Sequence, residues 1–210
     1  MYEQRHFLGG MLPGSHGEGD TLYVVYRVRD VVRIPPSLFG LPLEEAALRV
    51  LTERYVGFVH PDMGIIVAVF DVDVDPEGRL LPGDGATYHD SEYSVLAFKP
   101  RVKEVVEGVV VNAQQYGIWV NLGPIEGFAH ITQLMDDRVI FDQQRKAMIG
   151  EKTRKIVEIG NVVRARVVSV SMPTEPTLRP RIQLTLRQPY LGRPEWYRRK
   201  EEAKTAGQVQ

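Results

Sequence analysis

The chain has 210 residues, of which 43% are hydrophobic and 25% are charged, and its formal net charge is −1. This is ordinary usage for folded globular domains. Cysteine is absent, which excludes disulfide bonds and thiolate metal sites. No apolar run approaches the roughly 18 residues of a membrane helix, and the chain does not start with an apolar signal core, so we expect a cytoplasmic protein.

The near-neutral total hides an uneven distribution of charge. Residues 22–100 contain 7 Lys and Arg against 12 Asp and Glu, whereas residues 101–210 contain 18 against 12. A basic half favours a polyanionic ligand, and an acidic half is the better candidate for docking onto another protein. Nucleic-acid contacts are therefore expected in the second half of the chain.

The first hundred residues begin with a segment, 1–21, that is rich in glycine and shows no helical or strand period, so we expect a disordered extension. Tyr23–Ile34 predicts a strand that ends at Pro35–Pro36, because proline supplies no ladder N–H. A helix is predicted from Pro42, with an apolar stripe that should pack on a sheet. The stripe consists of Leu43, Ala46, Ala47, Val50 and Leu51.

Two further strands complete this first unit. Ile65–Phe70 predicts a buried strand that runs on to Asp75 with strict alternation of polar and apolar residues. Tyr93–Phe98 predicts another strand, after loops punctuated by proline and glycine. A strand, a helix and then more strands predict a small α+β domain over residues 22–100.

The second half predicts an all-β five-stranded barrel of the OB type over residues 101–197. Its strand candidates are Val105–Asn112, Gly117–Leu122, Gly127–Ile131, Asn161–Val170 and Arg181–Leu186. The connection between the third and fourth, Leu134–Glu158, is long for a loop, so we expect a helical insertion there. Residues 198–210 are polar and without period, and a disordered tail is expected.

Several motifs of the second half are similar to the S1 type of RNA-binding domain. The motifs are Glu107–Val111, Tyr116–Leu122, Glu126–Ile131, Gly160–Val163 and Ile182–Arg187. Aromatic Tyr116 and Phe128, close to His130, are typical of a barrel face that stacks single-stranded bases. The cations that could contact phosphates are Lys103, Arg164, Arg166 and Arg187. Each residue also has an ordinary alternative, namely core packing for the rings and a solvated surface for the arginines.

Longer stretches of both halves resemble the larger stalk subunit of archaeal RNA polymerase, homologous to the seventh subunit of eukaryotic RNA polymerase II. They are Val32–Gly40, Leu43–Leu48, Pro82–His89, Gly123–Gly127, Met135–Asp142, Val163–Val168 and Leu184–Gly192. The resemblance implies a ribonucleoprotein-like first domain that docks on the polymerase core near the clamp, beside a smaller stalk subunit. It further implies binding of nascent single-stranded RNA, support of promoter opening and elongation, and no catalytic site, cofactor or membrane contact in this chain.

Two loops of the first half are the candidates for docking, because loops rich in proline and glycine run over the surface and glycine lets a partner approach the backbone closely. The candidate docking residues are Pro35, Pro36, Phe39, Gly40, Gly83, Asp84, Gly85 and Tyr88.

Two other classes of protein would account for parts of the sequence, an RNA-binding factor outside transcription and a metal-dependent hydrolase. A translation or RNA-decay factor could use the same barrel, although it would leave the acidic first domain unexplained. A hydrolase could be built on Asp71, Asp73 and Asp75, which alternate as in some magnesium sites. The valines between them favour instead the polar side of a two-faced strand, and Pro76 stands where a calcium loop needs glycine. We therefore expect no metal.

Overall fold

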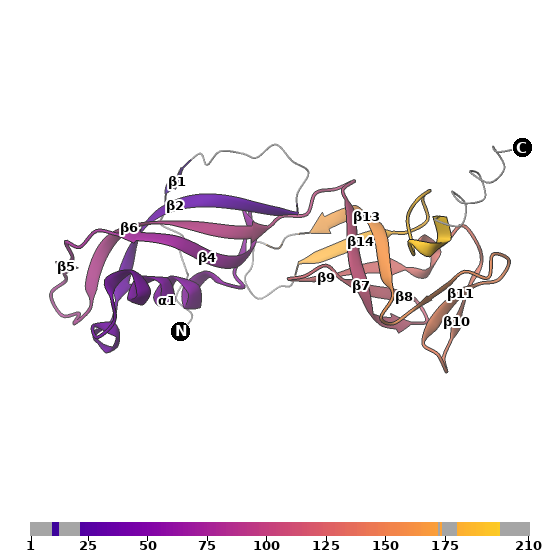
Figure 1. Ribbon diagram of the computed structural model, residues 1–210, viewed down its shortest axis with the longest axis horizontal. Coiled ribbons are helices and arrows are strands. Elements are labelled where there is room, and N and C mark those ends of the chain that lie inside the picture. Colours follow the sequence, from indigo (N-terminus) through magenta and orange to yellow (C-terminus); the bar gives the residue numbers. More distant parts are fainter. Residues whose placement is uncertain (1–9, 13–21, 172, 174–179, 198–210) are drawn as a thin grey trace, which may run out of the picture. The chain divides into compact units, whose positions relative to one another are not determined.

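A computed structural model describes residues 10–12, 22–171, 173 and 180–197 (Figure 1). The chain divides into two compact units between Lys99 and Pro100. The segments for which we expected disorder, 1–21 and 198–210, lie outside the described residues, apart from Gly10–Leu12. These three residues form strand β1 against an open strand edge, so the expectation was wrong for them.

The first unit is built on an antiparallel sheet of order β1-β2-β6-β4-β3, with β5 beside β6. Its long strands are β2 (Tyr23–Ile34), β4 (Gly64–Val74) and β6 (Thr87–Phe98), and its short ones are β3 (Val59–His60) and β5 (Arg79–Leu80). Along β2 the sequence alternates, so that Val28 and Val32 are buried on one face while Arg27 and Arg29 are exposed on the other.

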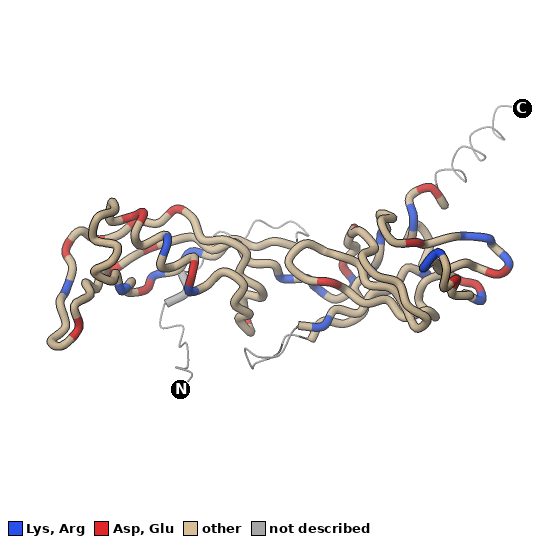
Figure 2. Tube along the Cα trace, turned by 90° about the horizontal axis from the view of Figure 1, so that it is seen from below, with Lys and Arg blue, Asp and Glu red and all other residues tan. Residues whose placement is uncertain are grey.

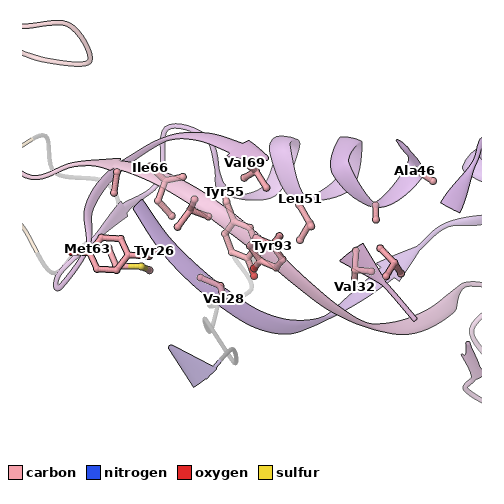
Figure 3. Close-up of a cluster of buried hydrophobic side chains, with 14 of the residues drawn as sticks. Tyr26, Val28, Val32, Ala46, Leu51, Tyr55, Met63, Ile66, Val69 and Tyr93 are labelled. Atoms are coloured by element: carbon pink, nitrogen blue, oxygen red, sulfur yellow. The ribbon is translucent and has the colours of Figure 1, made fainter. Parts of the chain in front are cut away.

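Helix α1 (Leu43–Tyr55) covers one face of this sheet, and the 3-10 turn η1 (Pro36–Leu38) precedes it. Ala46, Ala47 and Leu51 are buried, and Leu43 and Val50 pack partly against the same core, so the predicted stripe is confirmed. Figure 3 shows this core between the helix and the strands.

The last residue of α1 fastens the helix to β2. The Tyr55 hydroxyl donates a 2.7 Å hydrogen bond to Asp30. Burial, reinforced by this bond, raises the pKa of Tyr55 to about 12. The tyrosine therefore stays protonated and keeps donating at any physiological pH.

The alternation predicted for the second half of β4 is confirmed, since Asp71 and Asp73 are exposed while Val72 and Val74 pack toward the core. The pairing of β4 with β6 shifts between Ile66 and Ala68 and again between Phe70 and Asp73. Asp71 lies inside the second shift with a φ of 48°. This bulge interrupts the pairing of β4 with β6 but leaves the aspartates on the exposed side and the valines between them toward the core.

The second unit contains the closed barrel β13-β14-β9-β8-β7, which confirms the predicted five-stranded fold. The strands are β7 (Val105–Gln114), β8 (Gly117–Asn121), β9 (Glu126–His130), β13 (Val162–Ser171) and β14 (Arg181–Thr185). All neighbours are antiparallel except β9 and β14, which are parallel. Val110, Ile118 and Leu184 are among the side chains that fill the interior.

The prediction of a helical insertion between the third and fourth barrel strands was wrong. The segment forms a three-stranded antiparallel sheet of β10 (Val139–Asp142), β11 (Ala147–Gly150) and β12 (Ile156–Glu158), after a single 3-10 turn, η2 (Ile131–Gln133). Length alone favoured a helix. The short apolar runs and the two polar turns between them, with left-handed Lys146 and Arg154, favour hairpins instead.

The segment that follows β14 fastens this small sheet to the barrel. Gly192 exchanges backbone hydrogen bonds of 2.7 and 2.9 Å with Arg164 of β13. Arg193 donates to the Ile156 carbonyl of β12 at 3.2 Å, and the Lys155 ammonium lies 4.9 Å from the Trp196 ring centroid. The segment after β14 thus contacts both β13 of the barrel and β12 of the small sheet, and these contacts fix the position of the small sheet.

Burial along α1 predicts a contrast between two of its leucines. Leu51 is 1% exposed and Leu48 is 37% exposed. Leu51→Ala should lower the free energy of unfolding by about 2–5 kcal/mol, because it leaves a cavity under the helix. Leu48→Ala should cost less than about 1 kcal/mol. Urea denaturation of both variants checks this, and equal losses would contradict the packing described for α1.

Candidate nucleic-acid interface

Three aromatic rings gather on the outer face of strands β8 and β9. The Trp119 and Phe128 ring centroids are 5.0 Å apart, and Tyr116 lies 5.4 Å from Trp119 and 6.0 Å from Phe128. His130 continues the row at 6.5 Å from Phe128. We call Tyr116, Trp119, Phe128 and His130 the aromatic face.

The sequence of the two strands turns these rings outward. Trp119 pairs with Phe128 across the strands, while the alternate residues Ile118 and Ala129 point into the barrel and are fully buried. Gly117 makes room for the face, because a Cβ there would lie 2.7 Å from the Phe128 ring and 2.4 Å from the Ala129 carbonyl oxygen. Any larger residue would displace the ring.

The rings remain accessible. Tyr116 is 50% exposed, His130 is exposed, and Trp119 and Phe128 are half-buried. The His130 Nδ1 atom lies 2.9 Å from the Thr132 hydroxyl, which fixes the imidazole orientation. Exposed aromatic surface with fixed geometry can stack unpaired bases.

Trp119 is a member of this face that the sequence analysis missed. The signal was available, since Trp119 stands between Ile118 and Val120, both typical of a barrel interior, and strand alternation puts it on the outside with Phe128.

Two of the four predicted phosphate contacts lie at different ends of the barrel. Arg187 follows β14. Just before it, the Leu186 amide donates a 2.7 Å hydrogen bond to the Gln133 carbonyl of η2, and η2 directly follows His130. The Arg187 guanidinium already donates to Asp136 at 2.7 and 3.1 Å. Lys103 precedes β7, whereas Tyr116 follows it, so the full length of that strand separates them.

Of the other two arginines, Arg164 is engaged within the domain and Arg166 is half-buried. Arg164 donates to Glu107 at 2.6 and 2.8 Å and lies over the Tyr197 ring. The hydrogen bond from Arg164 to Glu107 raises the pKa of the guanidinium. Arg166 is half-buried, and its Nε atom is buried without a hydrogen-bond partner among the described residues. The structure therefore does not gather the four cations around the aromatic face.

The two loops predicted to dock emerge together from the first domain. Strands β2 and β6 pair along their whole length, and Ile34, the last residue of β2, is opposite Thr87, the first of β6. The loop after β2 and the loop before β6 therefore meet, and a Cβ on Gly85 would lie 3.5 Å from the Pro36 ring. Phe39 is 52% exposed at this end.

Asp84 organises the loop before β6. It accepts hydrogen bonds of 2.8 and 2.7 Å from Arg33 and one of 2.6 Å from the Tyr88 hydroxyl. Those bonds, the one from Arg33 foremost, hold the pKa of Asp84 well below its ordinary value. The Ala86 amide also donates to it at 3.2 Å. Asp84 and Tyr88 are thus anchors within the loop.

In the part of the chain that the structure describes, the histidines, aspartates and glutamates form no group of three placed to hold a metal ion. None of its helices combines the length and apolar character needed to cross a membrane.

Comparison with known families defines the class of protein. Residues 29–85 match the SHS2 domain found in the N terminus of Rpb7p/Rpc25p/MJ0397, and residues 99–175 match the S1 RNA binding domain. The chain thus joins an SHS2 domain to an S1 RNA-binding domain, in the order of the two structural units.

Relatives narrow the class to one family. The chain is 46% identical over 175 residues to the DNA-directed RNA polymerase subunit Rpo7 of Saccharolobus shibatae, covering 83% of this chain and 97% of that protein. Rpo7 of Sulfolobus acidocaldarius is 40% identical, covering 83% and 94%. Subunit RPB7 of RNA polymerase II from Saccharomyces cerevisiae is 29% identical over 138 residues, covering 65% and 80%. The chain belongs to the Rpo7 family, so it is an archaeal-type subunit of an RNA polymerase complex and not itself catalytic.

The contacts of Asp84 predict how its loop responds to mutation and pH. Asp84→Ala should speed amide hydrogen exchange at Ala86 several-fold with little change in the melting temperature, because only this loop loses its anchor. Since folding lowers the pKa of Asp84, the anchoring is complete above the ordinary carboxyl range and is lost as the pH falls through the lowered pKa. Asp90→Ala, which removes the exposed pair with Arg79, is the control and should leave exchange at Ala86 unchanged.

Proposed function

We propose that this chain is the larger stalk subunit of an archaeal RNA polymerase, acting in the cytoplasm. In this proposal the SHS2 domain docks on the polymerase core near the clamp, and a smaller stalk subunit completes a heterodimer. The S1 domain holds nascent single-stranded RNA, and the stalk supports promoter opening and elongation. The aromatic face is the observation that carries the RNA-binding part.

Stacking on the aromatic face suits single-stranded RNA better than a duplex. Paired bases hide their faces, whereas unpaired bases can lie against Tyr116 and Trp119. Every base has a π-face, so the sequence preference should be slight, as a subunit that meets every transcript requires.

Docking through the paired loops of the SHS2 domain is supported by their exposed apolar surface. Phe39 is exposed in the loop whose Pro36 ring lies against Gly85, and Gly85 offers a partner backbone with no side chain in the way. Exposed aromatic anchors of this kind often dominate the energy of an interface.

A translation or RNA-decay factor with the same barrel is the alternative. It does not explain the first domain, which matches the SHS2 domain found in the N terminus of Rpb7p and its relatives. Nor does it explain why 97% of the Saccharolobus shibatae Rpo7 subunit aligns with this chain. The polymerase subunit accounts for both domains.

Replacing the aromatic rings should weaken RNA binding. Trp119→Ala and Tyr116→Ala should each cost roughly 1–3 kcal/mol if one base stacks on the ring. The measurement is fluorescence anisotropy with a labelled oligouridine. Tyr190→Ala removes another exposed tyrosine, outside the face, and should bind like wild type. Wild-type affinity in both ring variants would return these rings to a packing role.

Truncating the docking anchor should weaken assembly. Phe39→Ala should reduce affinity for the polymerase core by about tenfold or more, since an anchor side chain contributes upwards of about 1–2 kcal/mol. Val56→Ala removes another exposed apolar side chain at the opposite end of α1 and serves as control. A pull-down of core subunits with each variant decides the matter, and equal recovery of core with all three proteins would take Phe39 out of the interface.

A further inference from the structure

Basic residues concentrate in the small sheet of the S1 domain. Residues 138–155 contain six Lys and Arg against two Asp and Glu. Figure 2 shows positive positions gathered at the end of the second domain where this sheet lies. The sheet has two turns, one at 143–146 and one at 151–155, which we call the basic turn.

The structure distinguishes the cations that are already engaged from those that are not. Arg138 lies 3.8 Å from Glu151, and Lys155 lies over Trp196. Lys152 and Arg154 are exposed, and neither has an ion pair with any described residue. The basic turn therefore presents two uncompensated positive charges to solvent.

The basic turn is held rigidly. Asp137 accepts hydrogen bonds from the Thr153 amide at 2.7 Å, the Thr153 hydroxyl at 2.9 Å and the Lys152 amide at 3.0 Å. Gly150 and Arg154 close the turn with a backbone bond of 3.1 Å. The Thr153 amide is the main cause of the lowered pKa of Asp137. A fixed turn orders its two cations before any ligand arrives, which reduces the entropic cost of binding.

A chain of contacts connects the basic turn to the aromatic face. Asp137 follows Asp136, which binds Arg187 at the end of β14. That end of β14 is bonded to Gln133 through the Thr185 hydroxyl at 2.9 Å, and η2 begins next to His130. The turn at 143–146 lies at the other end of β11, away from Asp137.

We propose that Lys152 and Arg154 form a second RNA contact, which binds phosphates of a single strand as it leaves the aromatic face past His130 and Arg187. The proposal rests on the RNA-binding function proposed above and extends it. Stacking holds bases and carries little salt dependence, whereas this turn adds backbone charge neutralisation that any sequence can use. The S1 domain then binds longer strands more tightly than its aromatic face alone allows.

The test compares two labelled oligouridines, of about 4 and about 12 nucleotides, both within the range of roughly 4–16 nucleotides that one barrel of this type binds. Their affinities for the full chain are measured by fluorescence anisotropy at several salt concentrations. The variant is Lys152→Ala with Arg154→Ala. The control is Arg145→Ala with Lys146→Ala, which removes the same charge from the other turn of the same sheet.

We expect the basic-turn variant to bind the short strand like wild type and the long strand about tenfold more weakly at low salt. Its log–log salt slope for the long strand should fall by about 1.4, the value for two lost contacts to a single strand. The control variant should keep the wild-type slope.

The outcomes separate this inference from the function on which it rests. If Trp119→Ala leaves the short strand bound as before, the aromatic face fails as an RNA site. If that face binds but the basic-turn variant matches wild type on the long strand, the second contact is overturned, and an acidic protein partner becomes the better ligand for the turn. Equal losses in both double variants would overturn it too, because they would indicate a diffuse field.

Discussion

The register between β8 and β9 is the constraint on which the candidate interface depends. It places Trp119 opposite Phe128 on the outer face and Ile118 beside Ala129 in the interior. Because successive residues of a strand point to opposite faces, a slip of one residue would bury the rings and expose the core. The barrel interior and the aromatic face are therefore specified by a single pairing, and the hydrophobic effect that stabilises the interior also holds the exposed rings in place.

Strand pairing also positions the candidate docking loops of the SHS2 domain. Strands β2 and β6 pair without interruption, from Tyr23 opposite Phe98 to Ile34 opposite Thr87. The loops that leave the sheet after Ile34 and enter it before Thr87 therefore lie together. Asp84 then fixes one loop through Arg33, a residue of β2 itself. A surface offered to a partner can be built from loops when rigid strands set where they begin and an ion pair limits how they move.

Much of the fold was predictable from the sequence, and the failures have physical causes. Alternation and helical spacing identified the five barrel strands and the α1 stripe, because burial on one face leaves a period in the sequence. The insertion was misassigned because its strands have only three or four residues, too few to show a period, so length was left to decide. Strand β6 proved longer than its apolar part because Thr87–Ser91 joins the sheet with polar side chains, including a His89 ring bonded to the Asp75 carbonyl at 2.8 Å.

The positions of the aromatic rings in the candidate site were predictable from the sequence. Which of its cations are free to contact a phosphate was much less predictable. Tyr116, Phe128 and His130 do lie together, since strand spacing determines which rings share a face. Spacing says nothing of whether an arginine is already paired, and Arg164 and Arg187 are, with Glu107 and Asp136.

A surplus of positive charge in a sequence therefore overstates what a fold offers to a polyanion. Pairing within the domain neutralises some cations and aromatic packing holds others, and these groups must break a contact before they can meet a phosphate. The cations that count are those the fold fixes in position and leaves uncompensated. In this S1 domain Lys152 and Arg154 meet both conditions, because Asp137 binds the backbone and the threonine of their turn but neither charged group. A carboxylate that accepts hydrogen bonds from amides and a hydroxyl orders a basic turn without forming an ion pair with its cations, which leaves their charged groups available to a phosphate.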